Sequence, residues 1–129
     1  MAFALNQIGQ VTLGVASADA SEAFYGSKLG LRKLFRFGGL CFFDCAGVRL
    51  LIDQVQPGTS VASGSHIYFK VADIALARRE LEARGVEFVD KIHLISPMED
   101  HDLWMSFFKD PDGHLLALMS EVPKGFKPV

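Results

Sequence analysis

The sequence predicts an α+β fold of two tandem βαβββ modules, each an open sheet with a helix on one face. The stretch from Gln10, QVTLGVASADASEAFYGSKLG, aligns with the stretch from His66, HIYFKVADIALARRELEARG. Later, FFDCAGVRLLI (42–52) aligns with FFKDPDGHLLAL (107–118). The elements therefore occur in the same order in both halves, and an internal repeat of this kind constrains the architecture.

Each half begins with a strand and continues into a helix. Apolar residues at alternate positions of 11–15 and 67–71 predict strands with one buried face. Ser17 and Asp73 follow as helix N-caps, because a short side-chain oxygen can accept a hydrogen bond from a free amide of the first turn.

Three further strands are expected after each helix. They are LRKLFRF, GLCFFD and VRLLIDQ in the first half, and VEFVD, DLWMSFF and HLLALM in the second. Asp, Pro and Gly supply the turns between them. We expect one domain over 1–129, with a first module at about 8–54, a Pro-, Gly- and Ser-rich linker at about 55–65, a second module at about 66–121 and a C-terminal tail at 122–129.

Composition excludes several classes of partner. The 129 residues carry a formal net charge of −2, which leaves no basic surplus for a nucleic acid backbone. Apolar runs fall short of the ~20 residues that cross a bilayer, and the amino terminus lacks the pattern of a signal peptide. Cys41 and Cys45 are separated by roughly 13 Å along an extended strand, so both are expected as free thiols. These features predict a cytoplasmic protein that binds neither nucleic acid nor membrane.

With these elements in this order, the chain resembles the vicinal oxygen chelate superfamily, the glyoxalase, bleomycin-resistance and extradiol-dioxygenase group. The segments ASEAFYGSKLGL, HIYFKVAD and DPDGHLLAL carry the resemblance, which extends from about Gln10 to about Glu121. It implies that the two modules form a cupped, mixed β-sheet half-barrel with the helices outside. This fold hosts lyases, transferases, dioxygenases and drug binders without catalytic activity, so the fold alone does not decide the activity.

The resemblance also identifies four positions from which side chains hold a metal ion in metal-dependent members. Carried over residue by residue, these positions are Gln10, Leu51, His66 and Ala117. Gln10 and His66 offer donor atoms, whereas Leu51 and Ala117 offer none. Because a divalent ion acting as a Lewis acid needs about three protein ligands, we expect no metal and no other cofactor.

Strand alternation predicts which side chains line the cup. If each tight turn has a two-residue loop, Leu40 and Phe42 face inward opposite Leu51 and Arg49. The same assumption pairs Trp104, Ser106 and Phe108 with Met119, Ala117 and Leu115. The candidate ligand-binding residues are therefore Gln10, Phe42, Arg49, His66, Tyr68, Trp104, Ser106 and Phe108.

Two of these groups have competing interpretations. Arg49 could bind a ligand carboxylate through two parallel hydrogen bonds, or it could pair with Asp53 on the same strand. His66 could be a residual metal ligand, a general base or a hydrogen-bonding histidine, and the absence of an acidic companion favours the last role or contact with a ligand. The segment HLISPMEDHDLW (93–104) is interpreted as a solvated loop that could cover the cup.

The sequence leaves three functions open and identifies no catalytic residue. The leading hypothesis is a metal-independent protein that binds a small, partly aromatic organic molecule, as a resistance or sequestering protein does. Drug-binding relatives are dimers, so the resemblance implies a homodimer. The second hypothesis is a glyoxalase-like lyase, or a related transferase or dioxygenase, whose metal is held by His66 and further ligands such as Asp53 or His101. In the third, side chains fill the cup and the chain serves only in assembly.

Overall fold

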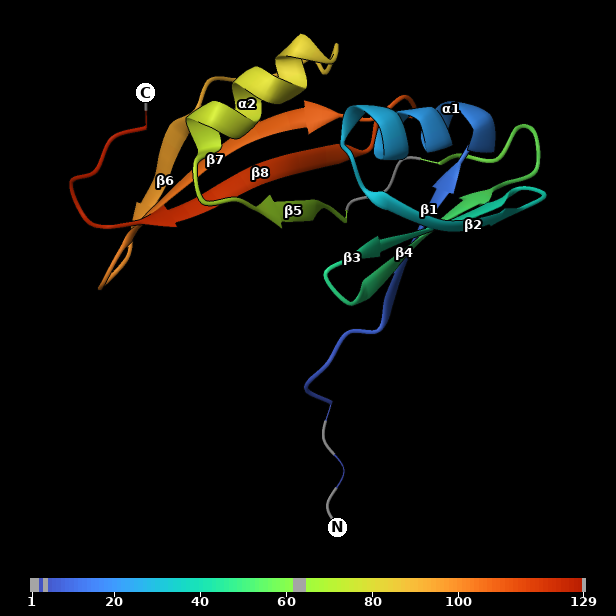
Figure 1. Cartoon of the computed structure of the whole chain (residues 1–129), viewed down its shortest axis with the longest axis horizontal. Coiled ribbons are helices and arrows are strands. Elements are labelled where there is room, and N and C mark those ends of the chain that lie inside the picture. Colours follow the sequence, from blue (N-terminus) through green and yellow to red (C-terminus); the bar gives the residue numbers. More distant parts are fainter. Residues whose placement is uncertain (1–2, 4, 62–64, 129) are drawn as a thin grey trace. The chain divides into compact units, whose positions relative to one another are not determined.

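The computed structural model describes residues 3, 5–61 and 65–128, and the chain divides into two units, Met1–Ala62 and Ser63–Val129. In unit 1 the elements are β1 (Gln10–Val15), α1 (Ala18–Glu22), the π-helical segment η1 (Ala23–Lys28), β2 (Arg32–Phe37), β3 (Leu40–Cys45) and β4 (Val48–Gln54). In unit 2 they are β5 (Ile67–Lys70), α2 (Ile74–Ala83), β6 (His93–Pro97), β7 (Asp102–Lys109) and β8 (Leu115–Val122), as Figure 1 shows.

The predicted α+β fold is confirmed, because each unit is a βαβββ module with an open, four-stranded mixed sheet. The strand orders are β1-β4-β3-β2 and β5-β8-β7-β6. The first strand of each module runs parallel to the last, and the remaining pairs are antiparallel. No helix in the described part of the chain is long and apolar enough to cross a membrane.

The core of unit 1 lies between α1–η1 and one face of its sheet. Ser17 caps α1 as expected, because its hydroxyl accepts from the amide of Ala20 at 3.2 Å. From the helical segments, Phe24 and Tyr25 pack into the core with their rings edge to face at 5.2 Å. Strand residues at alternate positions complete this face: Leu13, Val15, Cys41, Phe43, Leu50 and Ile52 are all buried.

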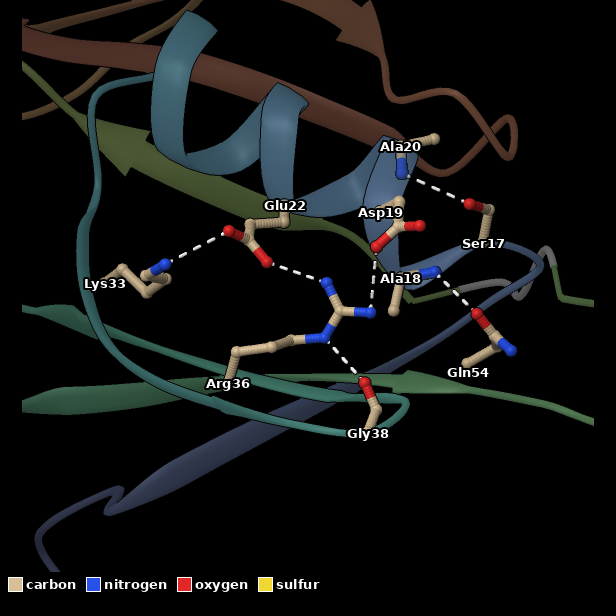
Figure 2. Close-up of polar contacts among 9 residues, drawn as sticks. All are labelled: Ser17, Ala18, Asp19, Ala20, Glu22, Lys33, Arg36, Gly38 and Gln54. Carbon is tan, nitrogen blue, oxygen red and sulfur yellow. Dashed lines mark hydrogen bonds and ion pairs between the residues drawn. The ribbon is translucent and has the colours of Figure 1, made fainter.

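A β-bulge in the edge strand β2 determines which of its side chains face the helix. Two basic side chains of β2 face α1, and its aromatic side chains face the opposite side of the sheet. The register shifts between Lys33 and Phe35, and such an extra residue re-aims the side chains that follow it. Lys33 Nζ and Arg36 Nη1 consequently both reach Glu22, at 3.1 and 2.7 Å. Arg36 also binds Asp19 at 3.0 Å, and Figure 2 shows this network between β2 and α1.

Helix α2 covers one face of the sheet in unit 2. Asp73 caps it through a carboxylate that accepts from the amide of Leu76 at 3.0 Å, which confirms the predicted N-cap. Ile74 and Leu81 are buried against the sheet. Arg78 extends from the helix, and its Nη1 donates to Ser106 Oγ of β7 at 2.8 Å.

Two predictions about the secondary structure of the second half are wrong. The segment VEFVD forms no strand and makes only an isolated bridge between Phe88 and Phe108. Val86 is buried, the amide of Val89 donates to the Phe107 carbonyl at 2.8 Å, and the amide of Phe107 donates to Asp90 Oδ1 at 2.8 Å. Single backbone and side-chain contacts therefore hold this segment, without a continuous ladder. The edge strand is instead β6, within the segment interpreted as a loop. Pro97 is compatible with it because an edge strand needs hydrogen bonds on one side only.

Candidate functional site

The face of the unit 1 sheet that points away from α1 is termed the first open face. It is formed by alternate residues that the helix does not cover. Its centre is at β4 and β3, where Phe42 pairs with Leu51 and Leu40 pairs with Asp53. Its members are Gln10, Thr12, Arg32, Phe35, Phe37, Leu40, Phe42, Asp44, Arg49, Leu51 and Asp53.

Arg49 is held across the first open face by neighbours on two strands. Its Nε donates to Gln10 Oε1 at 2.9 Å, and its guanidinium carbon lies 5.9 Å from the centre of the Phe42 ring. Phe42 in turn stacks on Phe35 with ring centroids 4.5 Å apart and planes at 21°. The structure therefore brings together three of the predicted residues, Gln10, Phe42 and Arg49, and adds Phe35.

The second open face is the face of the unit 2 sheet opposite α2. On β5 and β8, Tyr68 pairs with Ala117 and Lys70 pairs with Met119. His66 immediately precedes β5, and its ring meets Tyr68 edge to face at 6.5 Å. The members of this face are His66, Tyr68, Lys70, His93, Leu103, Met105, Phe107, Leu115, Ala117, Met119 and Glu121.

Ala117 is covered by aromatic side chains from both neighbouring strands. Tyr68 of β5 and Phe107 of β7 are its direct partners, and their rings meet edge to face at 6.1 Å. The Ala117 side chain is 0% exposed, although it belongs to the open face. A methyl group at this position thus gives two rings room to contact each other.

Polar groups gather at one end of the second open face. Glu121 binds Lys70 at 2.7 Å, and one of its oxygens lies 2.9 Å from His101 Nε2, while His101 Nδ1 lies 2.7 Å from Asp100. Hydrogen bonding from Lys70 lowers the pKa of Glu121, and hydrogen bonding from His101 lowers the pKa of Asp100. Both nitrogens of the His101 ring already lie against carboxylates, so a metal ion would have to displace one of them.

The predicted register of β7 is wrong by one residue. A three-residue loop connects β7 to β8, because the Asp110 amide donates to the His114 carbonyl at 3.1 Å and Gly113 takes a φ of 85°. Asp110 Oδ1 also accepts from the amides of Asp112 and His114, at 2.9 and 2.8 Å. Phe107 rather than Ser106 therefore pairs with Ala117. A slip of one residue moves every side chain of a strand to the other face.

Trp104, Ser106 and Phe108 consequently lie on the helix side of unit 2. Ser106 is buried and accepts from Arg78, and Phe108 is buried with its ring 5.1 Å from that of Phe88. Trp104 is half-buried and pairs with Ser120. In unit 1, by contrast, a two-residue turn at Ala46 and Gly47 shifts the predicted pairing by two residues, so Phe42 keeps its face.

The open faces contain residues that the sequence analysis missed. Phe107 and Met105 are present because of the β7 register, and His93 stacks on Phe107 with ring centroids 6.3 Å apart. Phe35 and Phe37 are present because of the bulge in β2. For Phe107 and Met105 the sequence did contain a signal. The spacing of Asp110 and Gly113 is typical of a three-residue loop that ends in a left-handed glycine.

The four family positions do not fit a divalent metal ion. Leu51 and Ala117 carry no donor atom, and the Gln10 oxygen already accepts from Arg49. Among the described residues of either unit, no three His, Cys, Asp or Glu side chains are grouped to hold a metal. What the described parts of these faces offer instead is aromatic surface, the guanidinium groups of Arg32 and Arg49, and several other hydrogen-bonding groups.

Comparison with known proteins identifies the family. The structure is similar to that of a glyoxalase family protein from Bacillus anthracis, with a TM-score of 0.76, 22% identity and coverage of 94% of this chain and 99% of that one. It is also similar to a glyoxalase/bleomycin resistance protein/dioxygenase from Nocardioides, with a TM-score of 0.75, 22% identity and coverage of 99% of this chain and 91% of that one. For a lactoylglutathione lyase from Agrobacterium tumefaciens, the TM-score is 0.71 and the identity 21%, with coverage of 89% of this chain and 93% of that one.

At these identities the structural similarities show the fold alone. No curated protein matches the sequence. A family model, however, matches residues 7–118, and on this basis the chain belongs to the Glyoxalase/Bleomycin resistance protein/Dioxygenase superfamily.

Proposed function

We propose that this protein binds a small, partly aromatic organic molecule at the open faces of its sheets, without a metal ion. One observation carries the proposal: large aromatic side chains remain exposed on faces that no helix covers. Phe35 is 50% exposed, Phe37 73% and Tyr68 44%. Exposed apolar surface of this kind marks interaction sites, and aromatic rings stack on flat ligands.

The polar groups beside these rings suit orientation of a ligand rather than bond breaking. Arg49 and Gln10 border the aromatic residues of the first open face, and His66 borders those of the second. A pocket of mostly apolar lining with a few placed hydrogen-bonding groups is typical of small-molecule sites. Storage, sequestration or resistance needs no more than this arrangement.

The proposal includes a homodimer in the cytoplasm. Exposed Phe37 and Tyr68 leave each unit with apolar surface that a second copy or a ligand would cover. Sedimentation equilibrium at several concentrations tests the dimer, and a monomer at all of them would contradict it.

The lyase hypothesis receives less support from the donor set. The name lactoylglutathione lyase describes the similar protein from Agrobacterium tumefaciens, and the likeness to it is one of fold. Asp53, one of the suggested additional ligands, has the apolar Leu40 opposite it on β3, and the two ring nitrogens of His101 lie 2.7 and 2.9 Å from carboxylate oxygens. We therefore favour binding over metal-dependent catalysis.

A thermal-shift screen tests the proposal. Aromatic metabolites and antibiotics are added to the full chain, because a ligand that binds the folded state raises the unfolding temperature. Phe35→Ala and Tyr68→Ala should each reduce the shift. Phe126→Ala is the matched control, since Phe126 is 54% exposed but lines a separate cavity with Ile74 at the start of α2.

The outcomes separate the hypotheses. A shift that the two open-face variants reduce and the control keeps supports the proposal. No stabilisation by any compound would favour the assembly role. Elemental analysis of protein purified without chelator provides the second test: about one divalent ion per chain, lost in His66→Ala, would restore the metal-dependent enzyme.

A further inference from the structure

We propose that the ligand of the first open face is an aromatic acid whose carboxylate binds Arg49 while its ring packs over the rings of Phe42 and Phe35. This inference rests on the proposed function and specifies the chemical class of the ligand. Four features of unit 1 carry it: the orientation of Arg49, the lack of an ion pair to Arg49 among the described residues, the exposed aromatic surface, and the distance from Arg49 to that surface.

The guanidinium of Arg49 is oriented with one edge in use and one edge available. Its Nε donates to Gln10 Oε1 at 2.9 Å, and the contact with the Phe42 ring limits rotation of the side chain. Nη1 and Nη2 have no hydrogen-bond partner within the described part of unit 1. This pair of nitrogens matches the two oxygens of a carboxylate, and a guanidinium fixed by its neighbours loses less entropy on binding.

The acidic side chains near Arg49 do not neutralise it. Asp44 is its direct partner on β3, but the Asp44 carboxylate binds Arg32 at 3.7 Å and accepts from the Gly47 amide at 3.2 Å. Asp53, the predicted alternative partner, forms no ion pair with Arg49 in the described residues. Among the described residues the exposed guanidinium of Arg49 forms no ion pair, and an unpaired cation beside aromatic side chains favours an anionic ligand.

The aromatic surface begins beside Arg49 and extends to the sheet edge. Arg49 lies on β4, Phe42 on β3 and Phe35 on β2. Two strand spacings of about 4.8 Å separate the first from the last. A ligand of one or two fused rings bearing a carboxylate spans this distance. Its ring replaces water over Phe35, which is half exposed, while its anionic end remains at the guanidinium.

Three probes of matched shape test the inference by equilibrium titration followed by NMR. They are 2-naphthoate, its neutral isostere 2-naphthamide and the non-aromatic acid cyclohexanecarboxylate. We expect 2-naphthoate to bind about tenfold more tightly than the amide, the ratio that a 1.4 kcal/mol charge-assisted contact gives. The largest shifts should occur at the Arg49 Nε–H and the amides of β3 and β4.

Arg49→Gln should remove the preference for acid over amide while leaving the weaker binding of the amide. Lys33→Gln is the matched control, because it removes the same charge from the same sheet at a residue paired with Glu22 on the helix side, away from Arg49. Retention of the preference in the control and its loss in Arg49→Gln support the inference. Equal binding of acid and amide, or equal losses in both variants, would overturn it and leave the proposed function standing.

Failure of the broader proposal has a different signature. In that case neither naphthyl compound binds, no neutral aromatic compound in the thermal-shift screen stabilises the chain, and Phe35→Ala has no effect on any compound. If cyclohexanecarboxylate bound as tightly as 2-naphthoate, the proposed role of the aromatic ring would be overturned, whereas the proposed role of Arg49 would stand.

Discussion

Tyr68 and Phe107 meet edge to face above Ala117, with their ring centroids 6.1 Å apart. The three residues lie side by side on β5, β7 and β8, and the alanine is fully covered. At this position metal-dependent members of the family are expected to present a ligand. The contact between the rings thus occupies the space that a longer side chain would need.

Ala117→Glu should therefore destabilise the protein instead of restoring a metal site. The new carboxylate must either be buried among the two rings without a partner or push them apart, and an unpaired buried polar group costs roughly 1–3 kcal/mol or more. Chemical denaturation measures the loss. Met119→Glu is the control, because Met119 lies two residues along the same strand and face but is only half-buried. Unchanged stability together with uptake of one divalent ion would contradict the prediction.

The neighbouring phenylalanines of β7 should respond differently to truncation. Phe108→Ala removes a fully buried ring on the helix side and should cost about 3–5 kcal/mol of unfolding free energy. Phe107→Ala should cost less, because Phe107 is half-buried on the open face, and it should reduce the affinity for an aromatic ligand. Urea denaturation and ligand titration of both variants measure the two effects. The reverse assignment would mean that the β7 register is not the one described.

Local signals were sufficient for the order of elements. Ser17 and Asp73 act through hydrogen bonds to residues three positions along the chain, so each N-cap is recognisable from a short stretch of sequence. The alternation of apolar residues along the first strand then identified Leu13 and Val15 as buried. The fold followed because these local preferences were repeated in both halves.

The candidate site was only partly predictable because it depends on register. Phe42 was placed on the correct face, since the two-residue turn after β3 changes its partner and not its face. The loop before β8 is one residue longer than predicted, so Phe107 instead of Phe108 lies on the second open face. The bulge in β2 placed Phe35 on the first open face, and no local pattern signalled it. Side-chain direction in a sheet therefore required the turn and bulge geometry.

The two thiols should react at different rates. Cys41 is fully buried on the helix side of β3, and burial raises the pKa of its thiol. Cys45 is half-buried at the end of the strand, and its pKa is also raised by burial. Because the thiolate is the reactive form, a disulfide-exchange reagent should label both slowly, with Cys45 first and Cys41 only after unfolding. In Cys45→Ser the native protein should be almost unlabelled, and rapid labelling of that variant would contradict the burial of Cys41.

The network between β2 and α1 predicts how stability depends on pH. Hydrogen bonds from Arg36, and then from Lys33, lower the pKa of Glu22 below its usual value of 4.5. A carboxyl group with a lowered pKa in the folded state contributes stability above its unfolded pKa, and this contribution disappears as the pH falls through the folded pKa. The wild-type chain should thus lose more stability than Glu22→Gln when the pH falls from about 6 to about 3.

Unfolding temperatures of both proteins across this pH range measure the effect. The difference between them should be largest near neutral pH and should shrink in acid, because protonated Glu22 resembles glutamine in charge. Glu87→Gln is the control, since Glu87 is exposed and no contact of its side chain is described. Its curve should follow that of the wild type. A constant difference between wild type and Glu22→Gln at every pH would show that the ionised carboxylate contributes nothing to holding β2 against α1.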